Sequence, residues 1–257
     1  MYSLYLLYFL VFMLGASFAS FICVFAERGN VKGRSICAGC HKKLKLYELI
    51  PIFSYIFLRG KCKDCESIIP VKLFLTEFAL GLWFLFTVYN AYTVTGLVLQ
   101  LILGCLFMYL VVEDLEDMSI SAKYLYLFVC IGLLEAIVTF VNTNNFVEIF
   151  VPLLIISPFW IIYFWNKNYI GEADPYVFTA LGLFFGTQFT VSLFLYSVWI
   201  GAAYGVIYLY FVNKKFERGI RIPFLPIIFA ASLLIIIFNF HIIKIQDILF
   251  IYENFFK

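Results

Sequence analysis

Long apolar stretches separated by short polar segments make up most of this sequence. About 20 apolar residues cross the hydrocarbon core of a bilayer, so the pattern predicts an all-α polytopic membrane protein with eight transmembrane helices. Their expected bounds are 3–25, 73–93, 96–112, 122–141, 147–165, 175–189, 190–212 and 224–243. The break at Gly186-Thr187-Gln188 that separates two of them is weak, and seven spans is the alternative.

The first apolar run resembles a signal peptide only superficially. No basic residue precedes it, and it is longer than the apolar core of a typical signal. We therefore expect it to be retained as the first transmembrane helix, residues 1–25. A polar loop at 26–72 follows, and residues 73–257 form the main membrane domain.

The distribution of Lys and Arg predicts the orientation of the chain. Ten of the 18 basic residues fall within 26–72. Four more lie at 213–222, and Lys123 and Lys167 occupy two further loops on the same side. Only Lys244 and Lys257 fall opposite. The N-terminus is therefore expected outside, with the loops 26–72, 113–122, 166–174 and 213–222 in the cytoplasm.

Composition supports the membrane assignment. Hydrophobic residues make up 64% of the chain and charged residues only 13%, whereas soluble domains are nearer half apolar and a quarter charged. The lipid bilayer is thus an expected partner. A net charge of +2 with no concentrated basic field gives no support for nucleic acid as a partner.

The polar loop contains two Cys-x-x-Cys motifs, Cys37 to Cys40 and Cys62 to Cys65. Two such pairs about 20 residues apart have the spacing of a structural zinc site, in which four thiolates surround one ion. Metal binding would supply folding energy to a loop with little core of its own. The alternatives are free cytoplasmic thiols or a redox pair. His41 is expected to be a solvated neighbour, because four ligands are already available.

Two acidic clusters adjoin predicted spans, at 113–117 and at 171–174. Both fall on the expected cytoplasmic side, so helix packing could bring Asp114 or Asp117 close to Asp174. Two carboxylates at one site share a proton, and such a pair can activate water and polarise a carbonyl. Two simpler interpretations remain open. Asp174 before Pro175 fits a helix N-cap, and 113–117 fits a solvated loop.

Three stretches across most of residues 15–186 carry ordered motifs. The first runs from Gly15-Ala16-Ser17-Phe18 through both cysteine pairs, with Leu49-Ile50-Pro51-x-x-Ser54 between them. The second places Asp114 six residues before Ile120-Ser121, and the third is Gly171-Glu172-Ala173-Asp174 with Gly182 eight residues later. In this order they resemble the prepilin peptidase family, the type IV leader peptidases of pilus, type II secretion and competence systems.

The resemblance implies particular site residues. It makes Asp114 and Asp174 the two catalytic aspartates, because the spacing to Ile120 selects Asp114 rather than Asp117. Where the family has a proline this chain has Ser121, and Ala173 and Tyr176 replace a glycine and a lysine of the third motif. These substitutions would alter the local backbone shape and remove the contacts that the family's lysine makes. Both aspartates are retained.

The resemblance also implies an activity. Residues 73–257 would form an aspartic endopeptidase that removes the basic leader of type IV prepilins or pseudopilins at the cytoplasmic membrane face. Glu113, Glu116, Asp117 and Glu172 would form an acidic rim suited to such a leader. Family members with the cysteine loop often also methylate the new N-terminus with S-adenosylmethionine. The resemblance therefore allows N-methylation of the product as a second activity. No cofactor-binding residues can be assigned for it.

Two other functional classes are consistent with parts of the sequence. A proton-coupled transporter would need carboxylates within spans, and Glu77 and Glu135 are the candidates. A non-catalytic pilus-assembly factor could use the cysteine loop to bind a cytoplasmic ATPase. The absence of an internal repeat disfavours the transporter, and the two motif aspartates disfavour the assembly factor.

Overall fold

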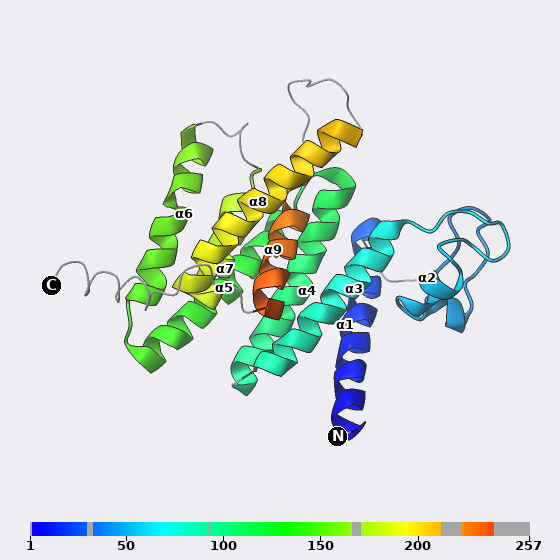
Figure 1. Cartoon of the computed structure of the whole chain (residues 1–257), viewed down its shortest axis with the longest axis horizontal. Helices are drawn as coiled ribbons and strands as arrows, with labels where there is room; N and C mark the ends of the chain where they lie inside the picture. Colours follow the sequence, from blue (N-terminus) through cyan, green and yellow to red (C-terminus); the bar gives the residue numbers. More distant parts are fainter. Residues whose placement is uncertain (1, 30–32, 92, 166–170, 212–222, 239–257) are drawn as a thin grey trace. The chain divides into compact units, whose positions relative to one another are not determined.

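The computed structural model describes residues 2–29, 33–91, 93–165, 171–211 and 223–238 (Figure 1). Within these ranges the regular secondary structure is helical apart from two isolated β-bridges, so the all-α prediction is confirmed for this part of the chain. The helices are α1 (Tyr2–Arg28), α2 (Phe53–Phe57), α3 (Val71–Asn90), α4 (Val94–Asp117), α5 (Ala122–Thr143), α6 (Val147–Trp165), α7 (Asp174–Phe185), α8 (Thr187–Phe211) and α9 (Leu225–Phe238), with a 3-10 turn η1 (Leu46–Leu49).

Each of the eight predicted spans corresponds to one helix, but the lengths of these helices differ. Six helices in the described ranges, α1, α3, α4, α5, α6 and α8, are long and apolar enough to cross a bilayer. Helices α7 and α9 have 12 and 14 residues, and at 1.5 Å per residue they are shorter than the hydrocarbon core. A multi-pass membrane protein is therefore established, while eight spans stays a prediction. The loop at 213–222, Lys167, Lys244 and Lys257 lie outside the described residues.

The boundary between α7 and α8 lies at Gly186, three residues before the predicted division at 189/190. Gly186 has a φ of 81°, a conformation that glycine adopts without strain. The carboxylate of Glu148 in α6 accepts the N–H of Thr187 at 2.9 Å and so satisfies the first turn of α8. The helix therefore stops where a glycine and a capping acid coincide.

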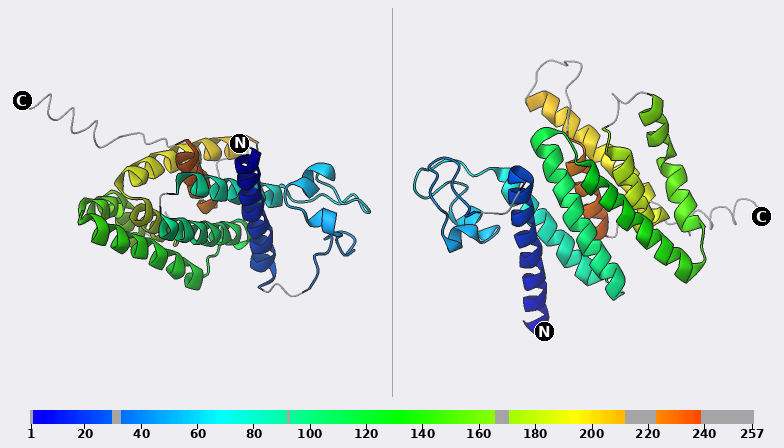
Figure 2. Two further views of the ribbon diagram at one scale, coloured as in Figure 1. Left: turned by 90° about the horizontal axis from the view of Figure 1, so that it is seen from below. Right: turned by 180° about the vertical axis from the view of Figure 1, so that it is seen from behind.

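Residues 1–112 form one compact unit and residues 113–257 another. In the first unit α1 and α3 pack against each other in opposite directions (Figure 2). Lys72 pairs with Glu27 at one end, and the ring of Tyr89 contacts that of Tyr8 at the other. Gly15 permits the close approach, since a Cβ there would lie 2.7 Å from a backbone oxygen of α3.

In the second unit α7 is the central helix and packs against α5, α6 and α8. Most of its side chains are buried. A Cβ on Gly132 of α5 would lie 2.5 Å from the backbone oxygen of Ala180, so the two helices touch backbone to backbone. Burial on all sides explains how so short an apolar helix is stabilised within a membrane domain.

Candidate active site

Asp114 lies in the last turn of α4, which continues through the acidic cluster rather than ending before it. The prediction that 113–117 is loop is therefore wrong. The helix ends when Met118 takes a positive φ of 50° and donates its N–H to the carbonyl of Asp114. Helical geometry places Asp114 on the buried side, with 9% of its surface exposed, and leaves Asp117 exposed.

The carboxylate of Asp114 is bound to the start of another helix. Its Oδ2 accepts the backbone N–H of Leu225, the first residue of α9, at 3.0 Å. The first N–H groups of a helix have no partner within the helix, and the helix dipole favours negative charge there. The start of α9 is thus a fixed electrostatic partner for an ionised Asp114.

Asp174 is the first residue of α7 and is 7% exposed. Its Oδ2 accepts the N–H of Gly171 at 3.1 Å. The alternative of an N-cap is wrong, because Ala173 occupies that position and makes no side-chain capping bond. Gly171 is required for the approach, since a Cβ there would lie 2.9 Å from the same oxygen. The loop that begins at Gly171 therefore positions the carboxyl group of Asp174. This carboxyl group does not cap α7.

The two aspartates influence each other electrostatically. Asp174 lies outside the six helices that are long enough to span the bilayer. Burial, and then the negative charge of Asp114, raise the pKa of its carboxyl group to about 7. Two carboxyl groups in these environments hold one proton between them near neutral pH. The helix N-terminus favours the ionised form of Asp114, and burial favours the protonated form of Asp174.

The family-motif substitutions have local structural partners. Ser121 donates both its N–H and its hydroxyl to the carboxylate of Glu113, so the turn after α4 is held by hydrogen bonds. Tyr176 packs edge-on against the rings of Trp160 and Tyr126. Glu113 is thus engaged within its own turn, while Glu116, Asp117 and Glu172 are exposed.

The four cysteines of the loop come together in two matching hairpins. In each, the residue after the second cysteine (His41 or Glu66) has a φ of 56°. In each, the N–H of the first cysteine bonds a carbonyl five residues later, Lys42 or Ser67. A β-bridge closes each hairpin, Ile36 with Lys43 and Lys61 with Ile68. These turns direct all four sulfurs to one point.

The sulfur cluster has the dimensions of a tetrahedral zinc site. The four sulfur atoms lie within 4.8 Å of one another, and those of Cys37 and Cys65 are 3.7 Å apart. Zinc–sulfur bonds of about 2.3 Å at tetrahedral angles require sulfurs about 3.8 Å apart. The Ser67 hydroxyl lies 3.3 Å from the sulfur of Cys37 and, with nearby backbone N–H groups, lowers the pKa of that thiol to about 5. Cys37, Cys40, Cys62 and Cys65 therefore fit zinc.

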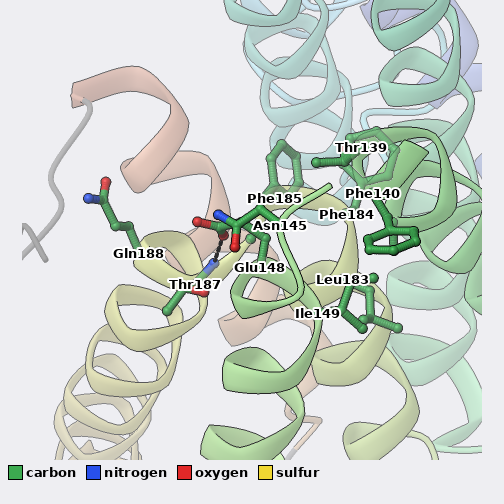
Figure 3. A pocket seen from close by; sticks show the side chains of 12 residues that line it. Thr139, Phe140, Asn145, Glu148, Ile149, Leu183, Phe184, Phe185, Thr187 and Gln188 are labelled. Atoms are coloured by element: carbon green, nitrogen blue, oxygen red, sulfur yellow. Dashed lines mark hydrogen bonds between the residues drawn. The ribbon is translucent and has the colours of Figure 1, made fainter. Parts of the chain in front are cut away.

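A cavity of about 330 Å³ lies elsewhere in the second unit, where the α5–α6 connection meets the junction of α7 and α8 (Figure 3). Neither aspartate lines it. Glu148, directed toward Thr187 in Figure 3, is the carboxylate that caps α8. We assign this cavity to the helix junction rather than to the reaction site.

Family models match two parts of the chain. The model of the bacterial peptidase A24 N-terminal domain matches residues 13–91, which contain the four cysteines, and that of the type IV leader peptidase family matches residues 101–206, which contain both aspartates. The chain belongs to the type IV leader peptidase family. The resemblance seen in the sequence motifs is thus confirmed.

Several relatives of this chain carry the name prepilin leader peptidase/N-methyltransferase. The protein from Bacillus subtilis is 26% identical and aligns over 82% of this chain and 84% of its own length. Those from Legionella pneumophila and Vibrio cholerae are 26% and 25% identical, over 78% and 79% of this chain and 71% and 80% of their own lengths. No solved structure matches the chain.

Two contributors to the described sites were missed by the sequence interpretation: Leu225 and Ser67. Leu225 acts through its backbone, and nothing in an apolar side chain signals such a role. Ser67 follows the second cysteine pair by two residues, a position from which a hydroxyl can reach the sulfurs. Glu77, considered as a proton-relay residue, instead accepts the N–H of Ile52 at 2.7 Å.

Proposed function

We propose that this protein is an aspartic endopeptidase that cleaves the leader of type IV prepilins or pseudopilins, with Asp114 and Asp174 as its catalytic pair. The observation that supports this most directly is the burial of both carboxyl groups. Burial, and then the negative charge of Asp114, raise the pKa of Asp174 to about 7, so a substantial fraction of this carboxyl group is protonated at neutral pH. Burial of Asp114 beside an exposed Asp117 supports the choice between the two neighbours.

The two carboxyl groups have complementary roles in the proposed reaction. Ionised Asp114 takes a proton from water as the hydroxide attacks the peptide carbonyl, and Asp174 gives its proton to the carbonyl oxygen. In the second half the C–N bond breaks. The amine leaves with the proton from Asp114, and the diol hydroxyl returns a proton to Asp174. Both aspartates then regain their starting states.

We further propose the topology that positive charges indicate, with the N-terminus outside and both aspartates on the cytoplasmic side. The exposed carboxylates Glu116, Asp117 and Glu172 would attract a basic leader. The names of the relatives also support N-methylation of the new N-terminus with S-adenosylmethionine as a second activity. Zinc, bound by the four cysteines, would hold the loop folded and would take no part in proteolysis.

The test is incubation of the reconstituted protein with a candidate prepilin, followed by N-terminal sequencing and mass measurement of the product. Asp114→Asn and Asp174→Asn should each abolish cleavage without loss of membrane insertion. Asp117→Asn is the matched control, because it removes an exposed charge three residues from Asp114, and it should retain most activity.

Three results would contradict the proposal. An active Asp114→Asn with an inactive Asp117→Asn would transfer the catalytic role to the neighbour. Full activity of Asp174→Asn would exclude a paired mechanism. Failure of the wild-type protein to cleave a range of prepilins would favour the assembly-factor alternative. A mass increase of one methyl group on the mature N-terminus would establish the second activity.

A further inference from the structure

Residues 46–58, between the two cysteine hairpins, carry apolar side chains that no described residue buries. Leu46 and Phe57 are 86% and 79% exposed. Four more exposed apolar side chains of this segment are Tyr47, Leu49, Ile50 and Ile56. Apart from Ile50, which lies between them, they come from η1 and α2, and these two elements pack against each other. An apolar surface of this kind in a polar loop indicates a missing partner.

The segment lies beside the membrane-spanning helices of its own unit. The N–H of Ile52 donates to the buried carboxylate of Glu77, which lies within α3. The ring of Phe53 contacts the ring of Phe9, a residue in the first half of α1, with centroids 6.3 Å apart. Tyr55 packs against Phe74 of α3 in the same way. In Figures 1 and 2 the loop accordingly lies alongside α1 and α3.

A strained turn fixes the chain at this place. Ile52 has φ 64° and ψ −54°, and the N–H of Phe53 donates to the carbonyl of Pro51 at 2.6 Å, which together define a three-residue turn. A β-branched residue with positive φ is a true outlier, at a cost on the order of 1–3 kcal/mol. Glu77 holds the strained residue by its N–H. The chain therefore reverses its direction at a point fixed to α3.

Several other backbone N–H groups of the segment have partners within it. The N–H groups of Ser54, Ile56 and Leu58 donate to the carbonyls of Ile50, Ile52 and Ser54. Backbone polar groups that approach hydrocarbon need protein partners, because no water is available there to bond them. The Glu77 carboxylate supplies such a partner to the N–H of Ile52. These bonds lower the cost of placing the segment against lipid.

Basic residues flank the apolar segment on both sides. Lys42, Lys43 and Lys45 precede it, and Arg59, Lys61 and Lys63 follow it. The ammonium groups of Lys45 and Lys63 lie 6.0 Å and 5.8 Å from the ring centre of Tyr47. Aromatic rings together with lysines are typical anchors at a membrane interface. Lysines near an anionic surface add electrostatic attraction to it.

We propose that residues 46–58 form a re-entrant segment that enters the bilayer at the surface where α1 ends and α3 begins. Its apolar side chains contact acyl chains, and the flanking lysines contact anionic phospholipid headgroups. The two cysteine hairpins then remain in water. The inference rests on packing within the first unit and is independent of the proposed peptidase activity.

The test uses trifluoromethyl-phenylalanine at single positions of the full chain in nanodiscs of phosphatidylcholine and phosphatidylglycerol. Phe57 is replaced almost isosterically at an exposed site, and Leu46 provides a second position. Glu66, exposed at the tip of a cysteine hairpin, is the control. Fluorine NMR then measures line broadening by a nitroxide on the lipid acyl chain and, separately, by a water-soluble gadolinium chelate.

We expect the lipid nitroxide to broaden the signals at 46 and 57 at least several-fold more than the signal at 66. The aqueous chelate should give the reverse order. Stronger broadening at 46 and 57 by the aqueous chelate would place the segment in water and overturn the proposal. Protection of these positions from both reagents would also overturn it, because the surface would then be covered by protein, such as a second copy of this chain.

Discussion

The carboxylate of Asp114 at the end of α4 and the backbone N–H of Leu225 at the start of α9 are joined by a hydrogen bond of 3.0 Å. The residues are 111 positions apart in the sequence. One aspartate of the proposed pair is thus oriented by a backbone peptide group and not by a side chain. A peptide N–H neither titrates nor changes rotamer, so it is a rigid support for a group that must change its protonation state.

Removal of this N–H should slow cleavage more than the loss of the Leu225 side chain. Leu225→Pro removes the donor, and proline is tolerated in the first turn of a helix. Leu225→Ala makes a similar truncation of the side chain but keeps the donor. A hydrogen bond to a charged group is worth about 1.5–3 kcal/mol, so we expect kcat about 10- to 100-fold lower for the proline variant than for alanine, at similar KM. Equal rates, measured on a prepilin peptide, would exclude the positioning role.

The activity should fall as pH rises above neutrality. The pKa of Asp174 is raised to about 7, first by burial and then by the charge of Asp114, so its proton is present below pH 7 and lost above it. Because this proton is donated to the substrate carbonyl, kcat/KM should decrease up to tenfold per pH unit on the alkaline side. The measurement is a pH–rate profile in nanodiscs with folding monitored throughout. Activity that rises continuously to pH 10 would contradict a shared proton.

The turn after α4 should depend on the bond between Glu113 and Ser121. A double-mutant cycle with Glu113→Ala and Ser121→Ala should give a coupling of about 1–2 kcal/mol in unfolding free energy, since the serine hydroxyl donates to a charged carboxylate. The backbone N–H of Ser121 remains in the alanine variant, so the cycle isolates the hydroxyl. A parallel cycle that combines Ser121→Ala with Asp117→Ala, at an exposed residue, should give almost no coupling energy. Equal couplings in both cycles would mean that the bond contributes nothing specific.

Purified protein should contain one zinc per chain when it is prepared under reducing, metal-replete conditions. Ser67→Ala should weaken zinc binding about 10- to 100-fold, because the hydroxyl that contacts the sulfurs of Cys37 and Cys65 is lost. Chelator competition measures the affinity. Ser35→Ala keeps the backbone carbonyl that accepts the N–H of Leu44 and serves as the control. Elemental analysis without zinc would contradict the metal assignment.

The sequence predicted the helices and the cysteine cluster well, because both depend on short-range patterns. Apolar runs indicated where helices lie, and the spacing within each Cys-x-x-Cys motif indicated a turn that directs two sulfurs together. The end of α4 was harder to place. An acidic cluster after an apolar run indicates solvent, whereas the helix continues one more turn and buries Asp114 on one face.

Contacts between distant residues could not be predicted. The pairing of Asp114 with Leu225 and that of Glu77 with Ile52 each join a carboxylate to a backbone N–H whose side chain is apolar. Only tertiary packing brings such groups together, and sequence patterns carry no mark of a particular peptide group. The N-cap interpretation of Asp174 failed for a related reason, since the loop from Gly171 turns the carboxyl group away from the helix start.

The matching architecture of the two cysteine hairpins has a consequence for folding. Each hairpin is closed by bonds between residues at most about nine positions apart, so each can form by itself on the microsecond timescale of local turns. The slower step is the meeting of the two hairpins across the intervening segment. The complete set of four thiolates exists only after both hairpins have met, so tight zinc binding would depend on the folding of the whole loop.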